Sequence, residues 1–99
     1  MIDKNQYLEA TTIQLEMWDQ WFTTLENDLG SARTKIRESL EAQLTQARRL
    51  KRRVEARLKR ADRKIGQGWV EARGELEAAS KSFRAAAIEL FDKSRLVVV

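Results

Sequence analysis

The stretch with the clearest chemical character is RRLKRRVEARLKRADRK, residues 48–64. Ten of its seventeen residues are Lys or Arg, and only Glu55 and Asp62 oppose them. Such a segment can neutralise phosphates and bind nucleic acid or another anionic surface with salt-dependent affinity. It contains no aromatic residue, Asn or Gln, so it predicts binding without base recognition. The candidate anion-binding residues are Arg48, Arg49, Arg52, Arg53, Arg57, Arg60 and Arg63.

Catalytic and metal chemistry find little support in the composition. The chain of 99 residues has no Cys and no His, so it lacks a thiolate nucleophile and the commonest metal ligand and general base. Its carboxylates are scattered at the spacings of helical charge pairs and form no clustered motif. We therefore expect no catalytic residue, no metal site and no cofactor, and we do not expect an enzyme.

Charge is distributed unevenly along the chain. Residues 1–32 carry one Lys against six acids (net −5), residues 33–64 carry thirteen basic residues against four acids (net +9), and residues 65–99 are neutral. Two copies that lie antiparallel, centred near residues 33–38, would place the acidic end of one on the basic part of the other. A solvated charged face, screened by salt, is the simpler alternative.

The pattern of apolar residues indicates an all-α protein. There is no Pro, and apolar residues recur at steps of three, four or seven nearly from end to end. We predict a first helix over about 3–64, a break at GQG (66–68), a shorter antiparallel helix over about 69–93 and a frayed tail over 94–99. Gly30-Ser31 is interpreted as a kink, and a three-helix arrangement is left open.

This coiled-coil hairpin would form a single domain, and we expect it to assemble into a helical bundle. Near the N-terminus a second apolar stripe (Ala10, Ile13, Met17, Trp21) runs beside the seam, so that helix needs more than one neighbour. An antiparallel homodimer is favoured, and another helical protein is a further candidate partner. The predicted self-association interface comprises Leu15, Trp18, Trp21, Phe22, Leu25, Leu29, Ile36, Leu50, Val54 and Leu58.

The location expected from the sequence is the cytoplasm. The opening MIDKNQYLEA is polar, unlike a secretory signal peptide. No stretch approaches the ~20 apolar residues that a membrane span needs.

Three segments, QLEMWD (14–19), GQGWVE (66–71) and LEAASKSFRAAAIELF (76–91), resemble a family of small bacterial two-helix coiled-coil proteins of the stress-response type. The similarity covers about residues 4–93. It implies a cytoplasmic, non-enzymatic helical protein with no catalytic residues to transfer. The function expected is thus self-association or interaction in a structural role, with a stress connection implied by the resemblance. The alternative is a sequence-nonspecific binder of nucleic acid or an anionic surface through residues 48–64.

Overall fold

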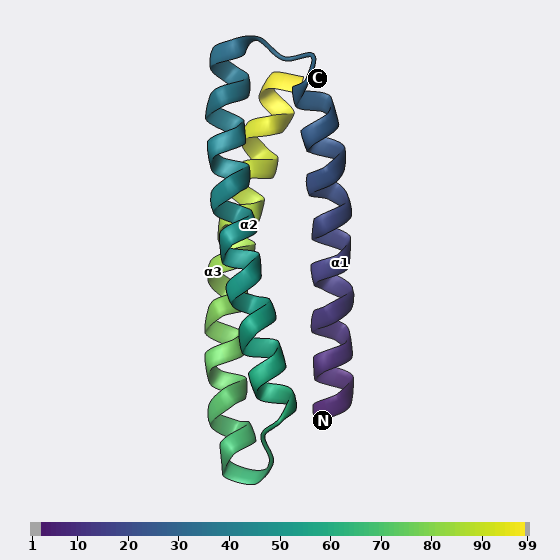
Figure 1. The fold of residues 1–99 in the computed structure, drawn as a ribbon, viewed down its shortest axis with the longest axis vertical. Coiled ribbons are helices and arrows are strands. Elements are labelled where there is room, and N and C mark those ends of the chain that lie inside the picture. Colours follow the sequence, from purple (N-terminus) through teal and green to yellow (C-terminus); the bar gives the residue numbers. More distant parts are fainter. Residues whose placement is uncertain (1–2, 99) are drawn as a thin grey trace.

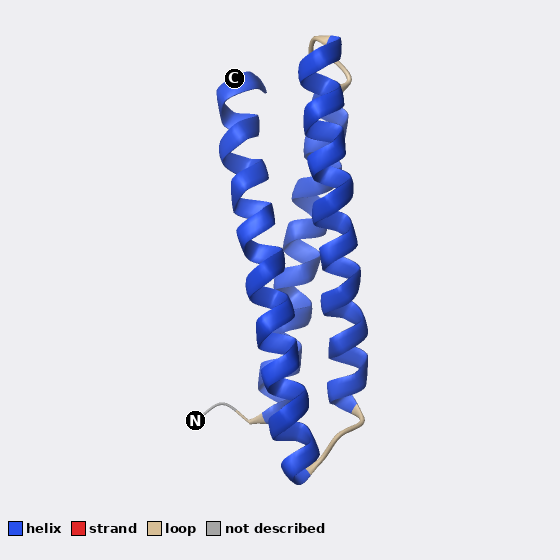
Figure 2. Cartoon of the chain, turned by 90° about the vertical axis from the view of Figure 1, so that its left-hand side faces the viewer, coloured by secondary structure: helices blue, strands red, loops and turns tan. Residues whose placement is uncertain are grey.

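A computed structural model describes the backbone of residues 3–98 and the side chains of residues 3–95. It has three helices: α1 (Lys4–Leu29), α2 (Thr34–Asp62) and α3 (Gly66–Val98). The first and third run in the same direction and the second runs antiparallel to both (Figures 1 and 2). The bundle measures 51 × 18 × 17 Å. The all-α prediction is confirmed, and the described part of the chain contains no strand.

The prediction of a single helix over residues 3–64 is wrong, because the chain turns back between Gly30 and Arg33. The backbone N–H groups of Gly30, Ser31 and Ala32 bond to carbonyls three residues earlier, which tightens the end of α1. Arg33 is extended, with φ −63° and ψ 145°, and begins α2. An unbroken helix would leave the apolar seam of its N-terminal half without a partner in the same chain, whereas the turn buries that half against the other two helices.

The second turn lies at residues 63–65 rather than at the predicted 66–68. Gly66 starts α3 with φ +56°, a left-handed conformation that glycine adopts without steric cost. The predicted end of the last helix at 93 was also wrong. The backbone stays helical to Val98, and Ser94 is buried with its hydroxyl donating to the Phe91 carbonyl oxygen. Val99 lies outside the described residues.

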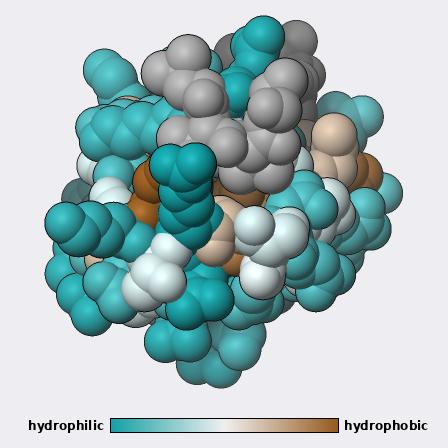
Figure 3. All heavy atoms as spheres, turned by 90° about the horizontal axis from the view of Figure 1, so that it is seen from above, coloured by the Kyte–Doolittle hydropathy of each residue, from teal (hydrophilic) through white to brown (hydrophobic). Residues whose placement is uncertain are grey.

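Residue size explains how closely the helices approach. Small residues such as Ala47, Ala61 and Ala72 are buried on α2 and α3. These two helices lie side by side near the second turn and diverge towards the C-terminal end of α3 (Figures 1 and 2). Aromatic rings fill the wider space next to α1. Trp18 and Phe22 both meet Phe83 edge-on, at 6.1 and 6.0 Å between ring centroids. Seen from one end of the bundle, hydrophilic residues surround the few apolar ones that are visible (Figure 3).

Candidate nucleic-acid interface

The acidic helix α1 lies along one flank of the basic helix α2. The Arg48 guanidinium donates two hydrogen bonds to the Glu26 carboxylate, at 3.1 and 3.2 Å. One turn further along, the Lys51 ammonium lies 3.2 Å from Asp19 and 2.8 Å from Glu55. The match between acidic and basic parts, which the sequence suggested for two chains, is thus made between two helices of one chain.

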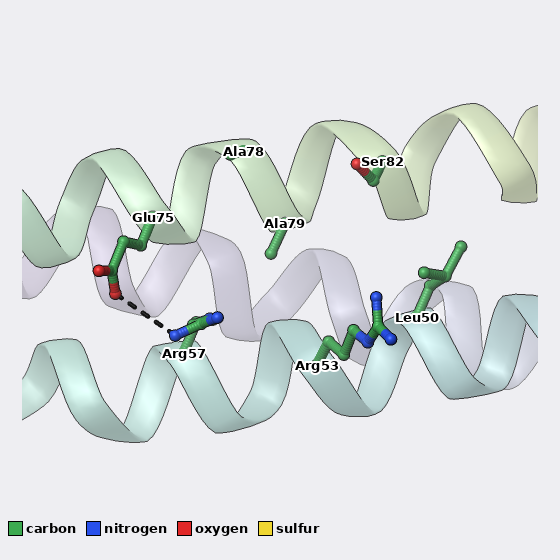
Figure 4. Close-up of a pocket in the computed structure, with 7 residues that line it drawn as sticks. All are labelled: Leu50, Arg53, Arg57, Glu75, Ala78, Ala79 and Ser82. Carbon is green, nitrogen blue, oxygen red and sulfur yellow. Dashed lines mark hydrogen bonds and ion pairs between the residues drawn. The ribbon is translucent and has the colours of Figure 1, made fainter.

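The opposite flank of α2 faces α3. Here Glu75 accepts a hydrogen bond from Arg57 at 3.4 Å (Figure 4). The same carboxylate lies 3.9 Å from Arg60. Arg53, Arg57 and Leu50 line one side of a groove of about 320 Å³, and residues of α3 line the other. The groove residues on α3 are Glu75, Ala78, Ala79 and Ser82.

The side of α2 that points away from both neighbours is basic. The buried positions Ala47, Val54 and Ala61 mark the inward face, and a helix places residues two positions away from them on the outward side. Four exposed basic residues lie on that side, and Arg53 and Arg60 lie at its border with the α3 flank. We call these six residues the outer basic face: Arg49, Arg52, Arg53, Lys59, Arg60 and Arg63. At 1.5 Å per residue the face extends over about 20 Å.

The acids in this half of α2 lie away from the outer basic face. Glu55 contacts Lys51 on the α1 flank, and Asp62 follows two turns later on the same flank. Among residues 3–95, Arg49, Arg52, Arg53, Lys59 and Arg63 form no ion pair. The face therefore presents cations that the side chains of residues 3–95 leave largely unneutralised.

The seven arginines predicted as an anion-binding set fall into two groups. Arg48 and Arg57 point to the flanks and pair with Glu26 and Glu75, while the other five belong to the outer basic face, where Arg60 also lies 3.9 Å from Glu75. Lys59 also lies there but was absent from the predicted set. Its spacing of seven residues from Arg52 was the signal that could have placed it.

The predicted self-association residues are placed in the interior of one chain. Leu15, Phe22, Leu25, Leu29 and Val54 are buried, and the other five are partly buried against the same core. Those five are Trp18, Trp21, Ile36, Leu50 and Leu58. The turn at residues 30–33 brings the two halves of the apolar seam together, so the seam finds its partner without a second chain.

Part of the second apolar stripe remains in contact with solvent. Ile13 is 49% exposed and Met17 is 64% exposed, and Ile88 of α3 is 51% exposed. A groove of about 410 Å³ runs between α1 and α3 on this side. Its lining residues are Gln14, Met17, Trp18, Trp21 and Arg84.

Two ionisable side chains have pKa values raised by their packing. Burial, and next the nearby Glu77 carboxylate, raises the pKa of Tyr7, whose ring meets Trp69 edge-on at 5.9 Å. Burial acts to lower the pKa of Lys51, but its hydrogen bonds to Glu55 and Asp19 outweigh that effect and raise it. Both groups hold α1 to a neighbouring helix.

Comparison of the chain with protein-family models, curated proteins and solved structures finds no match. In the part of the chain that the structure covers, no three His, Cys, Asp or Glu side chains gather as metal ligands would. None of the helices in residues 3–98 is both long and apolar enough to cross a membrane. The functional argument therefore depends on the geometry of the bundle.

Proposed function

We propose that this protein is a non-enzymatic helical module that binds double-stranded nucleic acid, without regard to sequence, through the outer basic face of α2. The observation that carries the proposal is the arrangement of charge. Acids of α1 and α3 occupy the two flanks of α2, and the six basic side chains of the outer basic face stay exposed, with Arg60 alone among them paired to an acid of the described residues.

The composition of the face favours phosphate as its ligand. Five of the six residues are Arg, whose planar guanidinium binds phosphate oxygens through two parallel hydrogen bonds. Like-charge neighbours such as Arg49 and Arg53, or Lys59 and Arg63, each destabilise an isolated helix by about 0.2–0.5 kcal/mol. Phosphate groups along the face would relieve that repulsion.

A nucleic-acid backbone fits this face better than a lipid surface does. A helix that binds a membrane in its plane buries a row of large apolar side chains in the lipid. On the outer basic face the apolar residue is Ala56, which is too small for that role. The face also has no aromatic side chain for stacking on bases, so we expect contacts with phosphates alone.

The test is fluorescence anisotropy with a labelled duplex of mixed sequence over a series of salt concentrations. If all six residues contact phosphates, the logarithm of the association constant should fall with that of salt with a slope of about −5. The double variant Arg52→Gln/Arg53→Gln should weaken binding and reduce the slope by about two. Lys81→Gln/Lys93→Gln, which removes the same charge from α3, should leave the slope unchanged. If the two double variants changed the affinity and the slope equally, binding would depend on net charge alone and not on the outer basic face. That result would contradict the proposal.

Self-association in a structural role is the second candidate. The exposed side chains of Ile13, Met17 and Ile88 support it, because an apolar strip on a small bundle is a common contact surface. A cytoplasmic location and the stress connection implied by the resemblance stay predictions. Sedimentation equilibrium over a range of concentrations distinguishes a monomer from an oligomer.

A further inference from the structure

The turn between α1 and α2 is weakly determined by its own residues. Gly30 has helical angles (φ −58°, ψ −26°), and no residue from 30 to 33 has a positive φ. Arg33 at the start of α2 makes no side-chain hydrogen bond that would cap the helix. The segment contains no Pro. All four residues can therefore adopt helical geometry, which would join α1 and α2 into one helix about 90 Å long.

The second turn is determined much more strongly. Gly66 has φ +56°, outside the range of a continuous right-handed helix. The ammonium of Lys4 also donates to the carbonyl oxygens of Asp62 and Lys64 at this turn, each at 2.7 Å. Of the two turns, the first is thus the one that can open.

The apolar seam runs through the first turn without a change of phase. Leu25, Leu29, Ala32 and Ile36 follow one another at steps of four, three and four. A helical hairpin does not require this continuity. Each of its two helices can turn its apolar face to the core independently of where the apolar face of the other helix lies. A single helix that passes along a partner does require it.

The ion pairs between α1 and α2 have a symmetric register. Glu26 pairs with Arg48, with a midpoint at residue 37, and Asp19 pairs with Lys51, with a midpoint at residue 35. Two fused helices that cross antiparallel at residue 36 would place the same side chains opposite each other, now between chains. No contact of the bundle has to change register.

We propose that the protein forms a dimer by exchanging α1 between two copies. In this dimer residues 30–33 are helical and α1 packs on α2 and α3 of the partner chain. The copies of Ile36, partly buried in the monomer, then meet at the two-fold axis. The residues of the predicted self-association interface that lie on α1, from Leu15 to Leu29, would then pack against the partner chain. This inference rests on the second candidate function and does not depend on nucleic-acid binding.

Cross-linking between two distinguishable chains tests the exchange, because the natural chain has no cysteine. A tagged chain with Glu26→Cys and an untagged chain with Arg48→Cys are unfolded together, refolded at high concentration and treated with a short bismaleimide. Exchange of α1 predicts a covalent heterodimer. The matched pair of chains with Arg57→Cys and Glu75→Cys should give at least tenfold less, since α2 and α3 stay in one chain.

Thr34→Pro provides a second test through the backbone. Proline is favoured at the first position of a helix and requires an extended residue before it, as Arg33 is. In the fused helix the same ring would clash with the carbonyl of Gly30. The variant should therefore fold as a monomer, with at least tenfold less dimer, whereas Thr34→Ala should dimerise like the natural chain.

Three results would overturn the proposal. One is a chain that stays monomeric after concentrated refolding, and another is equal cross-linking of both cysteine pairs. The third is a Thr34→Pro variant that dimerises normally. If this variant does not fold, as circular dichroism would reveal, the comparison of the two cysteine pairs decides alone.

Discussion

The ammonium group of Lys4, at the start of α1, donates a hydrogen bond of 2.7 Å to the main-chain carbonyl oxygen of Asp62 at the end of α2. The same group binds the carbonyl of Lys64 and lies 5.7 Å from the centroid of the Trp69 ring. A cation placed at the C-terminal end of a helix binds carbonyls that have no partner within the helix and offsets its dipole. Lys4 thus links all three helices at one end of the bundle.

Replacing this side chain tests the link. Lys4→Met keeps the aliphatic stem but removes the charge, so we expect the free energy of unfolding to fall by about 1 kcal/mol. For a domain of this size that corresponds to a melting temperature lower by about 4–8 °C. The control is Lys81→Met, on the exposed side of α3, which should change stability by less than about 0.5 kcal/mol. Equal melting temperatures for the two variants would show that Lys4 does not cap α2.

The two glycines Gly66 and Gly74 should respond oppositely to alanine. Gly66→Ala places a Cβ at φ +56° and should destabilise the fold by about 1–2 kcal/mol, although no atom lies within 4 Å of that Cβ. Gly74 is inside α3, where alanine favours the helix by about 1 kcal/mol and also has open space. Urea denaturation measures both changes. A neutral Gly66→Ala variant would mean that the second turn is as free to open as the first.

The core should be most sensitive where α3 is fully buried. Leu76 has no exposed surface, so Leu76→Ala should lower the free energy of unfolding by about 2–5 kcal/mol. Ile88 on the same helix is half exposed, and Ile88→Ala should cost less than about 1 kcal/mol. Urea denaturation compares the two, and similar losses would argue against the packing of α3 described above.

Stability should decline in alkaline solution because of Tyr7 and Lys51. The pKa of each is raised in the folded state, so both bind their protons more tightly when the chain is folded. The stabilisation is fully present below the unfolded pKa values, near 10 for Tyr and 10.4 for Lys. It is lost as the pH rises through that range towards the raised values.

Tyr7→Phe removes one of these groups while keeping the ring against Trp69. We expect the variant to lose less stability than the natural chain as the pH is raised past 10. Denaturation by urea at a series of pH values measures the slope for each. An unchanged slope in Tyr7→Phe would assign the alkaline decline to other groups.

The helical class of the fold followed from the sequence because it depends on features that are local. The chain lacks Pro, and the spacing of its apolar residues is helical throughout. The neighbourhood of the second turn was also predictable, since Gly66 supplies a conformation that other residues adopt only with strain. The predicted position of the turn, residues 66–68, differs from the observed one by a few residues because Gly68 fits within the first turn of α3.

The first turn could not be predicted because its residues are all compatible with a helix. The same property allows the turn to open in the proposed dimer. Gly30 keeps helical angles, and the seam from Leu25 to Ile36 keeps its phase. A long helix with a partner chain and a hairpin within one chain satisfy the same pattern of apolar residues. They also satisfy the same charges, since Glu26 faces Arg48 in either arrangement.

The outer basic face was predictable only in part. The sequence showed that residues 48–64 are basic, but not which side chains α1 and α3 would neutralise. That division depends on where Glu26, Asp19 and Glu75 come to lie. It separates Arg48 and Arg57, which pair with neighbouring helices, from residues such as Arg52, which face solvent.

The central claim is that the solvent side of α2 holds the nucleic-acid backbone. Backbone amide chemical shifts, recorded while a short mixed-sequence duplex is added to the isotope-labelled chain, test it most directly. We predict that the largest changes fall within residues 49–63 and are reversed by salt. Changes concentrated around Met17, Trp21 and Ile88, or none at all at low salt, would contradict the account.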